Sequence, residues 1–287
     1  MDQYTIEITT VQTSAMRILI EALKEILVDA NWEFIPKDPN DPEKAKHAGI
    51  KILAVNHKEG MLVHLKLHAD NFDKYHVTSK QILGVNMQCL HRVIKSVNNN
   101  DVLTIYRTEE ERNRLCFCIN KSDRAQENFV SLPLIDVDKD VFDVTNRMKF
   151  RAVVIMSSVN LQKICRDLNA LEVHEIEIMV ERKIMTIKGD GDVGNASLKL
   201  KDASEDQSNS NGAITIKMDD QDEDDDEIIH GKFDLKNLLM FTRCTGLCNN
   251  IEIYFKNDYP LFIKYAVANL GYVHLCLSPI IDEDDMD

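Results

Sequence analysis

The sequence predicts an α+β protein with two similar domains, each carrying two helices packed on largely antiparallel sheets. Three observations support this prediction. Many short segments alternate between apolar and polar residues, four segments have the apolar spacing of a helix, and the order helix, strands, helix, strands occurs twice along the chain. A chain of 287 residues is long enough for one large domain or for two domains of about 140 residues each.

Four segments are predicted to be amphipathic helices, because their apolar residues recur at intervals of three and four positions. In the first of them, Met16, Leu19 and Leu23 belong to one apolar stripe that would face a core. Ser158 and Asp234 stand at the starts of the last two helices and are predicted to cap their N-termini. The predicted helices are residues 16–27, 89–97, 160–168 and 234–243.

Between these helices the sequence alternates with a period of two, which is typical of strands with one face on a core and the other in water. Strands outnumber helices, so each domain is expected to place its helices on one side of extended antiparallel sheets. Examples of the predicted strands are residues 5–11, 49–55, 61–69, 101–107, 114–120, 175–181, 183–189, 196–202, 213–218, 251–257, 260–268 and 273–278.

The two domains are predicted to cover residues 1–131 and 148–287. The segment between them, 132–147, carries a Pro and several Asp residues and has no clear partner strand, so it is predicted to be an extended linker. Its apolar residues suggest that part of it packs on a domain surface. The second domain is expected to contain an acidic loop at 202–227 and to end in an acidic tail at 282–287.

The negative charge of the chain is concentrated in these two acidic segments. The chain has 34 Lys and Arg against 48 Asp and Glu, which gives a formal net charge of −14. The acidic loop carries −10 and the tail −5, so the rest of the chain is close to neutral. The overall acidity therefore does not exclude a nucleic-acid partner. Acidic segments of this kind are usually solvated loops and tails.

The composition favours a soluble intracellular protein. No apolar run approaches the ~18–20 residues that cross a bilayer, and the N-terminus lacks the basic and apolar parts of a signal peptide. Seven cysteines, an odd number, are expected to be reduced thiols, and the spacing of their two close pairs resembles a metal site only weakly. We therefore expect no membrane partner, no metal and no disulfide.

No motif predicts catalysis or a cofactor. The segment 189–194 matches G-x-G-x-x-G, but strands are predicted on both sides of it, and Asp190 and Asp192 would repel a phosphate, so it is predicted to be a hairpin turn. His64 and His68 alternate along a strand with Lys66, which is more typical of a solvated face than of metal ligands. The protein is therefore not expected to be an enzyme.

Each predicted helix carries two basic residues away from its apolar stripe, spaced so that the pair lies on roughly one helical face. Such charges are often just the solvated side of an amphipathic helix. If all four helices line one surface, however, eight cations gather there and would bind a phosphate backbone without regard to sequence. These residues are Arg17, Lys24, Arg92, Lys95, Lys163, Arg166, Lys236 and Arg243.

Several segments together resemble the family of proliferating cell nuclear antigen, the eukaryotic-type DNA sliding clamp. The resemblance extends from about Gln12 to Ile281, apart from the acidic insertion near 203–227. This insertion and the divergent N-terminus suggest a distant member of the family, such as a viral one. The runs that carry the resemblance are EALKEIL, FDKYHV, ILGVNMQCLHRVIK, KICRDL, GNASLKL and FIKYAVANLGYVHLCLSPII.

The resemblance implies the DNA clamp fold and a homotrimeric ring, in which the helices line the hole and the eight cations face double-stranded DNA. It also implies that the subunits join by pairing edge strands, roughly Gln126–Leu134 of one subunit with Asp192–Lys201 of the next. The residues that fall on this implied interface are Phe129, Val130, Val193, Asn195, Ser197 and Lys199.

The resemblance further implies a pocket beneath the linker that binds a short apolar and aromatic peptide of the PIP-box type. Residues 142–145 depart from the family's usual Gly and Pro, and Cys276 stands where an aromatic residue is usual, so client preference is expected to differ. The positions that match the pocket are Val55, Leu62, Phe142, Val144, Pro260, Ser278, Pro279 and Ile281.

The function that the resemblance implies is that of a non-enzymatic processivity factor in DNA replication and repair. Its implied partners are double-stranded DNA, a DNA polymerase, a clamp loader and other clients with PIP-box-like peptides. The implied location is the nucleus, or a cytoplasmic replication site for a viral member. Two alternatives stay open: a subunit of a heterotrimeric checkpoint-type clamp, and an acidic interaction or chaperone protein.

Overall fold

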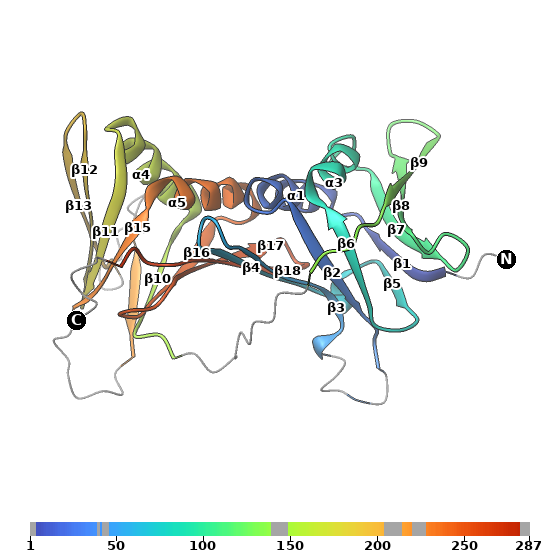
Figure 1. Cartoon of the computed structure of the whole chain (residues 1–287), viewed down its shortest axis with the longest axis horizontal. Coiled ribbons are helices and arrows are strands. Elements are labelled where there is room, and N and C mark those ends of the chain that lie inside the picture. The colour runs from blue at the N-terminus through green and yellow to red at the C-terminus, as the bar shows by residue number, and fades with distance from the viewer. Residues whose placement is uncertain are drawn as a thin grey trace. The chain divides into compact units, whose positions relative to one another are not determined.

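The computed structural model describes residues 4–38, 41, 46–138, 149–203, 214–219 and 228–281. The chain divides into two compact units, each built from segments that are separate in the sequence (Figure 1). Unit 1 consists of Met1–Asn56, Val63–Phe142 and Ala266–Val273, and unit 2 consists of His57–Leu62, Asp143–Tyr265 and His274–Asp287. The predicted boundaries at residues 131 and 148 stay predictions, and most of the predicted linker lies outside the described residues.

A five-stranded antiparallel sheet in unit 1 has the strand order β5-β1-β7-β8-β9. Ile8, Ile105 and Phe117 stand opposite one another on three neighbouring strands and are buried. The alternation of buried and half-buried residues confirms the predicted two-faced strands. The strands are β1 (Tyr4–Thr10), β5 (Lys74–Val77), β7 (Val102–Thr108), β8 (Arg114–Lys121) and β9 (Gln126–Pro133).

A second group of strands has the order β4-β3-β2-β6 and lies in unit 1 apart from the first two residues of β4, which belong to unit 2. Trp32 of β2 is buried and stands opposite Ile52 of β3, so the core also extends over this group. The strands are β2 (Asp29–Ile35), β3 (Gly49–Asn56), β4 (Met61–His68) and β6 (Gln81–Asn86).

Unit 1 includes the helices α1 (Thr13–Ile26), α3 (Met87–Ile94) and the short 3-10 helix η1 (Ala69–Asn71). α1 and α3 lie side by side (Figure 1). Met16 and Leu23 of the predicted stripe are fully buried, and Leu90 of α3 is only 2% exposed. The Asn86 side chain caps α3 by accepting a hydrogen bond from the N–H of Cys89 at 2.9 Å. Burial of these apolar stripes leaves the polar sides of both helices exposed.

Unit 2 contains a four-stranded antiparallel sheet with the order β13-β12-β11-β15. Ile176 and Phe233 face each other across two of its strands, and both are buried. Its strands are β11 (Val173–Glu181), β12 (Ile184–Gly191), β13 (Asn195–Lys201) and β15 (Ile229–Asp234).

A second group of strands in unit 2 has the order β14-β10-β16-β17, in which the buried Val154 stands opposite the buried Ile253. The last two residues of β17 belong to unit 1, and a further strand, β18, starts in unit 1 and ends in unit 2. The strands are β10 (Ala152–Ser157), β14 (Thr215–Met218), β16 (Asn250–Phe255), β17 (Leu261–Val267) and β18 (Gly271–Leu277).

The helices of unit 2 are α4 (Ser158–Ala170), α5 (Leu235–Phe241) and the 3-10 helix η2 (Thr242–Leu247). α4 and α5 lie in contact, and Leu161, Leu168 and Leu238 are buried. Each unit thus packs a pair of α-helices, α1 with α3 and α4 with α5, together with antiparallel sheets. This arrangement confirms the predicted α+β fold class.

Six strands were missing from the segments that alternation predicted: β2, β5, β6, β9, β10 and β15, of which the family resemblance alone had implied β9. β10 reads AVVIMS, a mostly apolar run without clear alternation, and β5 has only four residues. The last predicted helix is also shorter than expected, because α5 ends at Phe241 and the chain continues as η2. Local periodicity does not reveal such strands, because a strand is stabilised by pairing with other strands that lie far away in the sequence.

The predicted cap of α4 was wrong. Ser158 is the first residue of this helix, and the N-cap is Ser157, whose side chain makes no capping hydrogen bond. The buried Ser158 hydroxyl instead donates to backbone carbonyls beyond η2, most closely to Cys248 at 2.6 Å. Asp234 caps α5 as predicted, accepting a hydrogen bond from the N–H of Asn237 at 2.8 Å.

Replacing Ser158 with Ala is expected to lower the free energy of unfolding by about 1–2 kcal/mol, because the Cys248 carbonyl and its neighbours then lose the donor that the buried Ser158 hydroxyl supplies. Ser157→Ala is the matched control and should change stability by less than about 0.5 kcal/mol, since its side chain makes no capping bond. Urea unfolding followed by circular dichroism measures both effects. Equal destabilisation by the two variants would contradict the role given to the Ser158 hydroxyl.

Candidate functional site

The two predicted cations of α1 are half-buried and already engaged. The guanidinium of Arg17 donates to the carbonyl oxygen of Val97 at 3.3 Å and to the side-chain oxygen of Asn99 at 2.8 Å. The ammonium of Lys24 lies 3.2 Å from the carboxylate of Glu25. α1 therefore offers less free positive charge than the sequence pattern suggested.

The cations of the α3 region are exposed. Arg92 lies on the helix, whereas Lys95 is its C-cap, a position where a cation interacts favourably with the helix dipole. The pKa of His91 is lowered mainly by partial burial and, to a smaller extent, by the nearby positive charge of Lys24. The imidazole is therefore neutral at pH 7, and the charge on this side of the helix pair comes from lysine and arginine.

Unit 2 presents four exposed cations on its helices. Lys163 and Arg166 lie on α4 opposite its buried stripe, and Lys236 lies on the exposed side of α5. Arg243 belongs to η2 and not to α5, so the α-helical spacing used to pair it with Lys236 does not apply. Among the residues that the structure describes, these four side chains form no ion pair.

Two strands at sheet edges coincide with the implied subunit contacts. β9 is the last strand of the five-stranded sheet of unit 1, and β13 is the last strand of the four-stranded sheet of unit 2. Phe129 on β9 is 65% exposed, and Val193, just before β13, is 63% exposed. Val130 is half-buried, and the polar interface candidates Asn195, Ser197 and Lys199 are exposed on β13.

The glycine-rich segment is a hairpin turn, as predicted. β12 and β13 pair in antiparallel register up to Asp190 and Asn195. Gly191 and Gly194 exchange backbone hydrogen bonds of 3.3 and 3.1 Å across the turn. A strand follows the glycines where a dinucleotide site needs a helix, so this loop has no helix N-terminus to offer a phosphate.

The predicted peptide-pocket residues have different positions in the structure. Leu62, Pro260, Ser278, Pro279 and Ile281 belong to unit 2, where the N–H of Ser278 donates to the carbonyl of Gly60 at 2.9 Å. Ile281 is 67% exposed, whereas most of the others are half-buried. Val55 belongs to unit 1 and is half-buried, and the remaining candidates, Phe142 and Val144, lie outside the described residues.

A groove of about 530 Å³ on the four-stranded sheet of unit 2 was not predicted. Its lining comes from all four strands and includes Glu177 and Lys188, whose charged groups lie 3.8 Å apart. The groove also includes Asn195 and Ser197, so it borders the open edge of β13. Polar residues at alternate positions were the only signal in the sequence, and they do not show which strands are neighbours.

Seven free cysteines are distributed over both units, four of them buried. Burial raises the pKa of the Cys116 thiol to about 11 and that of Cys165 to about 12, so these groups are unreactive thiols at neutral pH. Within the described ranges, no three His, Cys, Asp or Glu side chains converge so as to hold a metal ion. No helix in the same ranges is long and apolar enough to span a membrane.

Comparison with known families and proteins adds an independent finding. The model of the proliferating cell nuclear antigen N-terminal domain matches residues 5–142, and that of its C-terminal domain matches residues 145–280. The chain is similar to the probable DNA polymerase sliding clamp of Acanthamoeba polyphaga mimivirus, with 27% identity over 307 aligned residues, 97% of this chain and 63% of the relative. It thus spans less than two thirds of that relative.

A second viral relative matches over nearly its whole length. The probable DNA polymerase sliding clamp 1 of Paramecium bursaria Chlorella virus 1 is 26% identical over 280 residues, which is 98% of both chains. Both relatives agree with the expectation of a distant, virus-like member. Because the two domain models together cover nearly the whole sequence in the expected order, this chain belongs to the proliferating cell nuclear antigen family.

Proposed function

We propose that this protein is a DNA sliding clamp, a ring-shaped processivity factor that encircles double-stranded DNA and tethers a DNA polymerase. Its family membership and the names of its two viral relatives support this function. The structural observation that carries it is the set of exposed cations on the helices of both units, opposite their buried stripes. The expectation that the chain is not an enzyme agrees with its family.

The charge distribution suits a sliding contact. Exposed lysine and arginine side chains attract phosphates through counterion release, which does not depend on base sequence. A clamp that moves along DNA needs contacts that are individually weak, and four exposed cations in unit 2 with two near α3 meet this requirement. Arg17 and Lys24 contribute less in this proposal, because they already bind groups of the protein.

Ring assembly in this proposal uses the open edges of β9 and β13. An unpaired strand edge readily adds a strand from another chain, and a head-to-tail contact between two different edges closes into a ring when the rotation fits. Glu127 on β9 and the exposed Lys199 and Lys201 on β13 provide opposite charges for such a contact. We propose a homotrimer, as the family resemblance implies.

Clients are proposed to bind at the apolar positions around Ile281, through PIP-box-like peptides of the polymerase, the clamp loader and repair proteins. We place the protein at sites of DNA replication, either nuclear or, as for a viral clamp, cytoplasmic. A subunit of a heterotrimeric clamp would contain the same strands but would not assemble alone. An acidic chaperone would depend on the acidic segments, whose residues lie mostly outside the described ranges.

Reversal of exposed helix cations is expected to shorten polymerase run length and to weaken DNA association about tenfold at low salt, because phosphate contacts would be replaced by repulsion. Primer extension with the loaded clamp and a salt titration of DNA binding measure this. The variant carries Glu at Arg92, Lys163, Arg166 and Lys236.

The matched control makes the same change in charge at exposed lysines outside the helices. It should leave run length close to that of the wild type. If the control shortens the run equally, overall charge and not the helix surface is responsible. The control carries Glu at Lys58, Lys80, Lys217 and Lys256.

Replacing Phe129 with Asp is expected to weaken self-association about tenfold or more, because it puts a charge into the proposed strand contact while removing an exposed apolar ring. Val28→Asp is the control, since Val28 is 72% exposed and lies between α1 and β2, outside β9 and β13. Sedimentation equilibrium over a range of concentrations distinguishes the two. Unchanged association of the Phe129 variant would argue against β9 as the contact.

Replacing Ile281 with Asp is expected to weaken binding of a fluorescent PIP-box peptide about tenfold, because a charge then occupies an apolar contact. Val11→Asp, at a residue 53% exposed at the end of β1, should leave the affinity unchanged. Fluorescence anisotropy measures both. Equal peptide affinity of the Ile281 variant and the wild type would remove Ile281 from the site.

A further inference from the structure

A buried carboxylate of unit 1 takes no part in the surfaces described above. Asp101 stands just before β7, and its side chain is 0% exposed. The carboxylate accepts hydrogen bonds from the backbone N–H groups of Asn98 (2.8 Å) and Ser122 (3.2 Å) and from the ammonium of Lys121 (2.8 Å). Burial alone would raise the pKa of Asp101, but these hydrogen bonds outweigh it and lower the pKa, so the group is charged at neutral pH.

Lys121 connects this carboxylate to a third segment. Its side chain is only 10% exposed, and its ammonium also donates to the carbonyl oxygen of Ser96, just after α3, at 2.6 Å. Lys121 is the last residue of β8, and the turn at residues 122–125 leads from it into β9. The Asp101–Lys121 pair thus ties the β8–β9 turn to the loop between α3 and β7.

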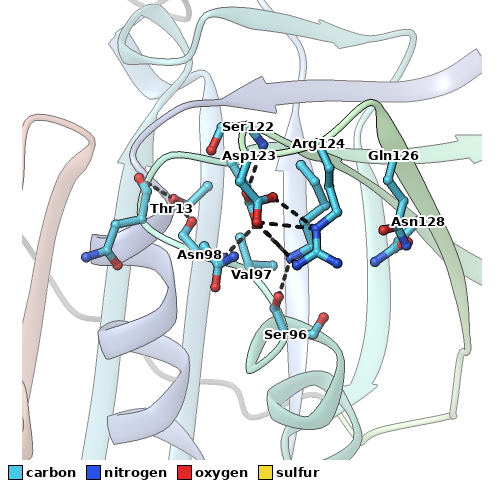
Figure 2. A network of polar contacts seen from close by, with 12 residues as sticks. Thr13, Ser96, Val97, Asn98, Ser122, Asp123, Arg124, Gln126 and Asn128 are labelled. Carbon is cyan, nitrogen blue, oxygen red and sulfur yellow. Dashed lines mark hydrogen bonds and ion pairs between the residues drawn. The ribbon is translucent and has the colours of Figure 1, made fainter.

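The same loop is held by α1 from another side. The hydroxyl of Thr13 donates to the carbonyl of Asn98 at 2.8 Å, and Arg17 donates to that of Val97 at 3.3 Å. Figure 2 shows Thr13, Asn98 and Ser122 gathered around one polar network. The turn that precedes β9 is therefore connected, through this network, to the beginning of α1.

β9 depends on hydrogen bonds at its ends, because few of its own side chains are buried. Leu132 is the one buried residue of the strand. Beyond its far end, the N–H groups of Leu134 and Ile135 donate to carbonyls of neighbouring segments at 2.9 and 3.0 Å. The near end, at Gln126, directly follows the turn that the Asp101 network holds.

We propose that the buried Asp101–Lys121 pair is a positioning device for β9, which holds the near end of this edge strand where a second copy of the chain can add to it. The inference rests on the edge pairing of the proposed function and deepens it. A buried ion pair is a weak source of stability, because desolvation offsets much of the attraction. The hydrogen bonds of the pair are directional and therefore fix the position of the segments that they join. A strand that pairs in register with a partner over several residues tolerates little displacement.

The test uses Lys121→Met in the full-length chain, with Asp101→Asn as a second variant. In Lys121→Met, Asp101 keeps its two backbone donors, so unit 1 is expected to stay folded. Self-association, measured by sedimentation equilibrium, should weaken about tenfold. Amide hydrogen exchange should accelerate about tenfold or more at Ser122 and Gln126–Phe129, and it should not change in β11 and β12.

Asp123→Asn is the matched control, because it removes an exposed ion pair from the same turn. The Arg124 guanidinium lies 3.2 Å from the Asp123 carboxylate, and the two side chains are 65% and 53% exposed. This variant should associate and exchange like the wild type. The wild type, the two pair variants and the control are compared at equal concentrations.

The outcomes separate this inference from the proposed function. If the wild type associates and both pair variants associate equally well, the positioning role is overturned. It is also overturned if exchange accelerates throughout unit 1, since the pair would then act only on overall stability. A wild type that stays monomeric would remove the proposed edge pairing, while exchange at Gln126–Phe129 would still decide whether the pair positions β9.

Discussion

Burial of the apolar helix stripes against the sheets is the constraint on which the rest of the structure depends. Leu23 of α1 and Leu161 of α4 belong to stripes that are buried almost completely, and the polar sides of the helices are left outside. When an amphipathic helix packs its apolar side on a core, its polar side necessarily faces away from that core. The exposure of Lys163 and Lys236 is therefore a consequence of packing.

Open sheet edges are the second physical feature on which the proposed function depends. β9 and β13 are the edge strands of their sheets. The unpaired backbone groups of an edge strand can pair with a strand of another chain unless the edge is covered. The buried network around Asp101 lies where β9 has little core packing of its own. Order at this edge thus comes from directed hydrogen bonds, whereas order in the middle of the sheet comes from apolar contacts such as that of Ile105 with Phe117.

Much of the fold and part of the candidate site could be predicted from the sequence. The four helices, the Asp234 cap and the hairpin at Gly191 follow from local spacing and local residue types. Strands such as β10 were missed because a continuous apolar run has no period to detect. The engagement of Arg17 and the sheet groove beside β13 were missed because their contacts join residues that are distant in the sequence.

The sequence by itself determined the fold class, the family resemblance and the set of cations that the helices carry, since periodicity and residue type are local properties. Only the tertiary structure decided which of these cations are free, that Ser158 binds carbonyls beyond η2, and that Lys121 reaches Asp101. Each of these depends on the distance between atoms of separate segments. Such distances are set by packing of the whole unit, and no pattern along the chain encodes them directly.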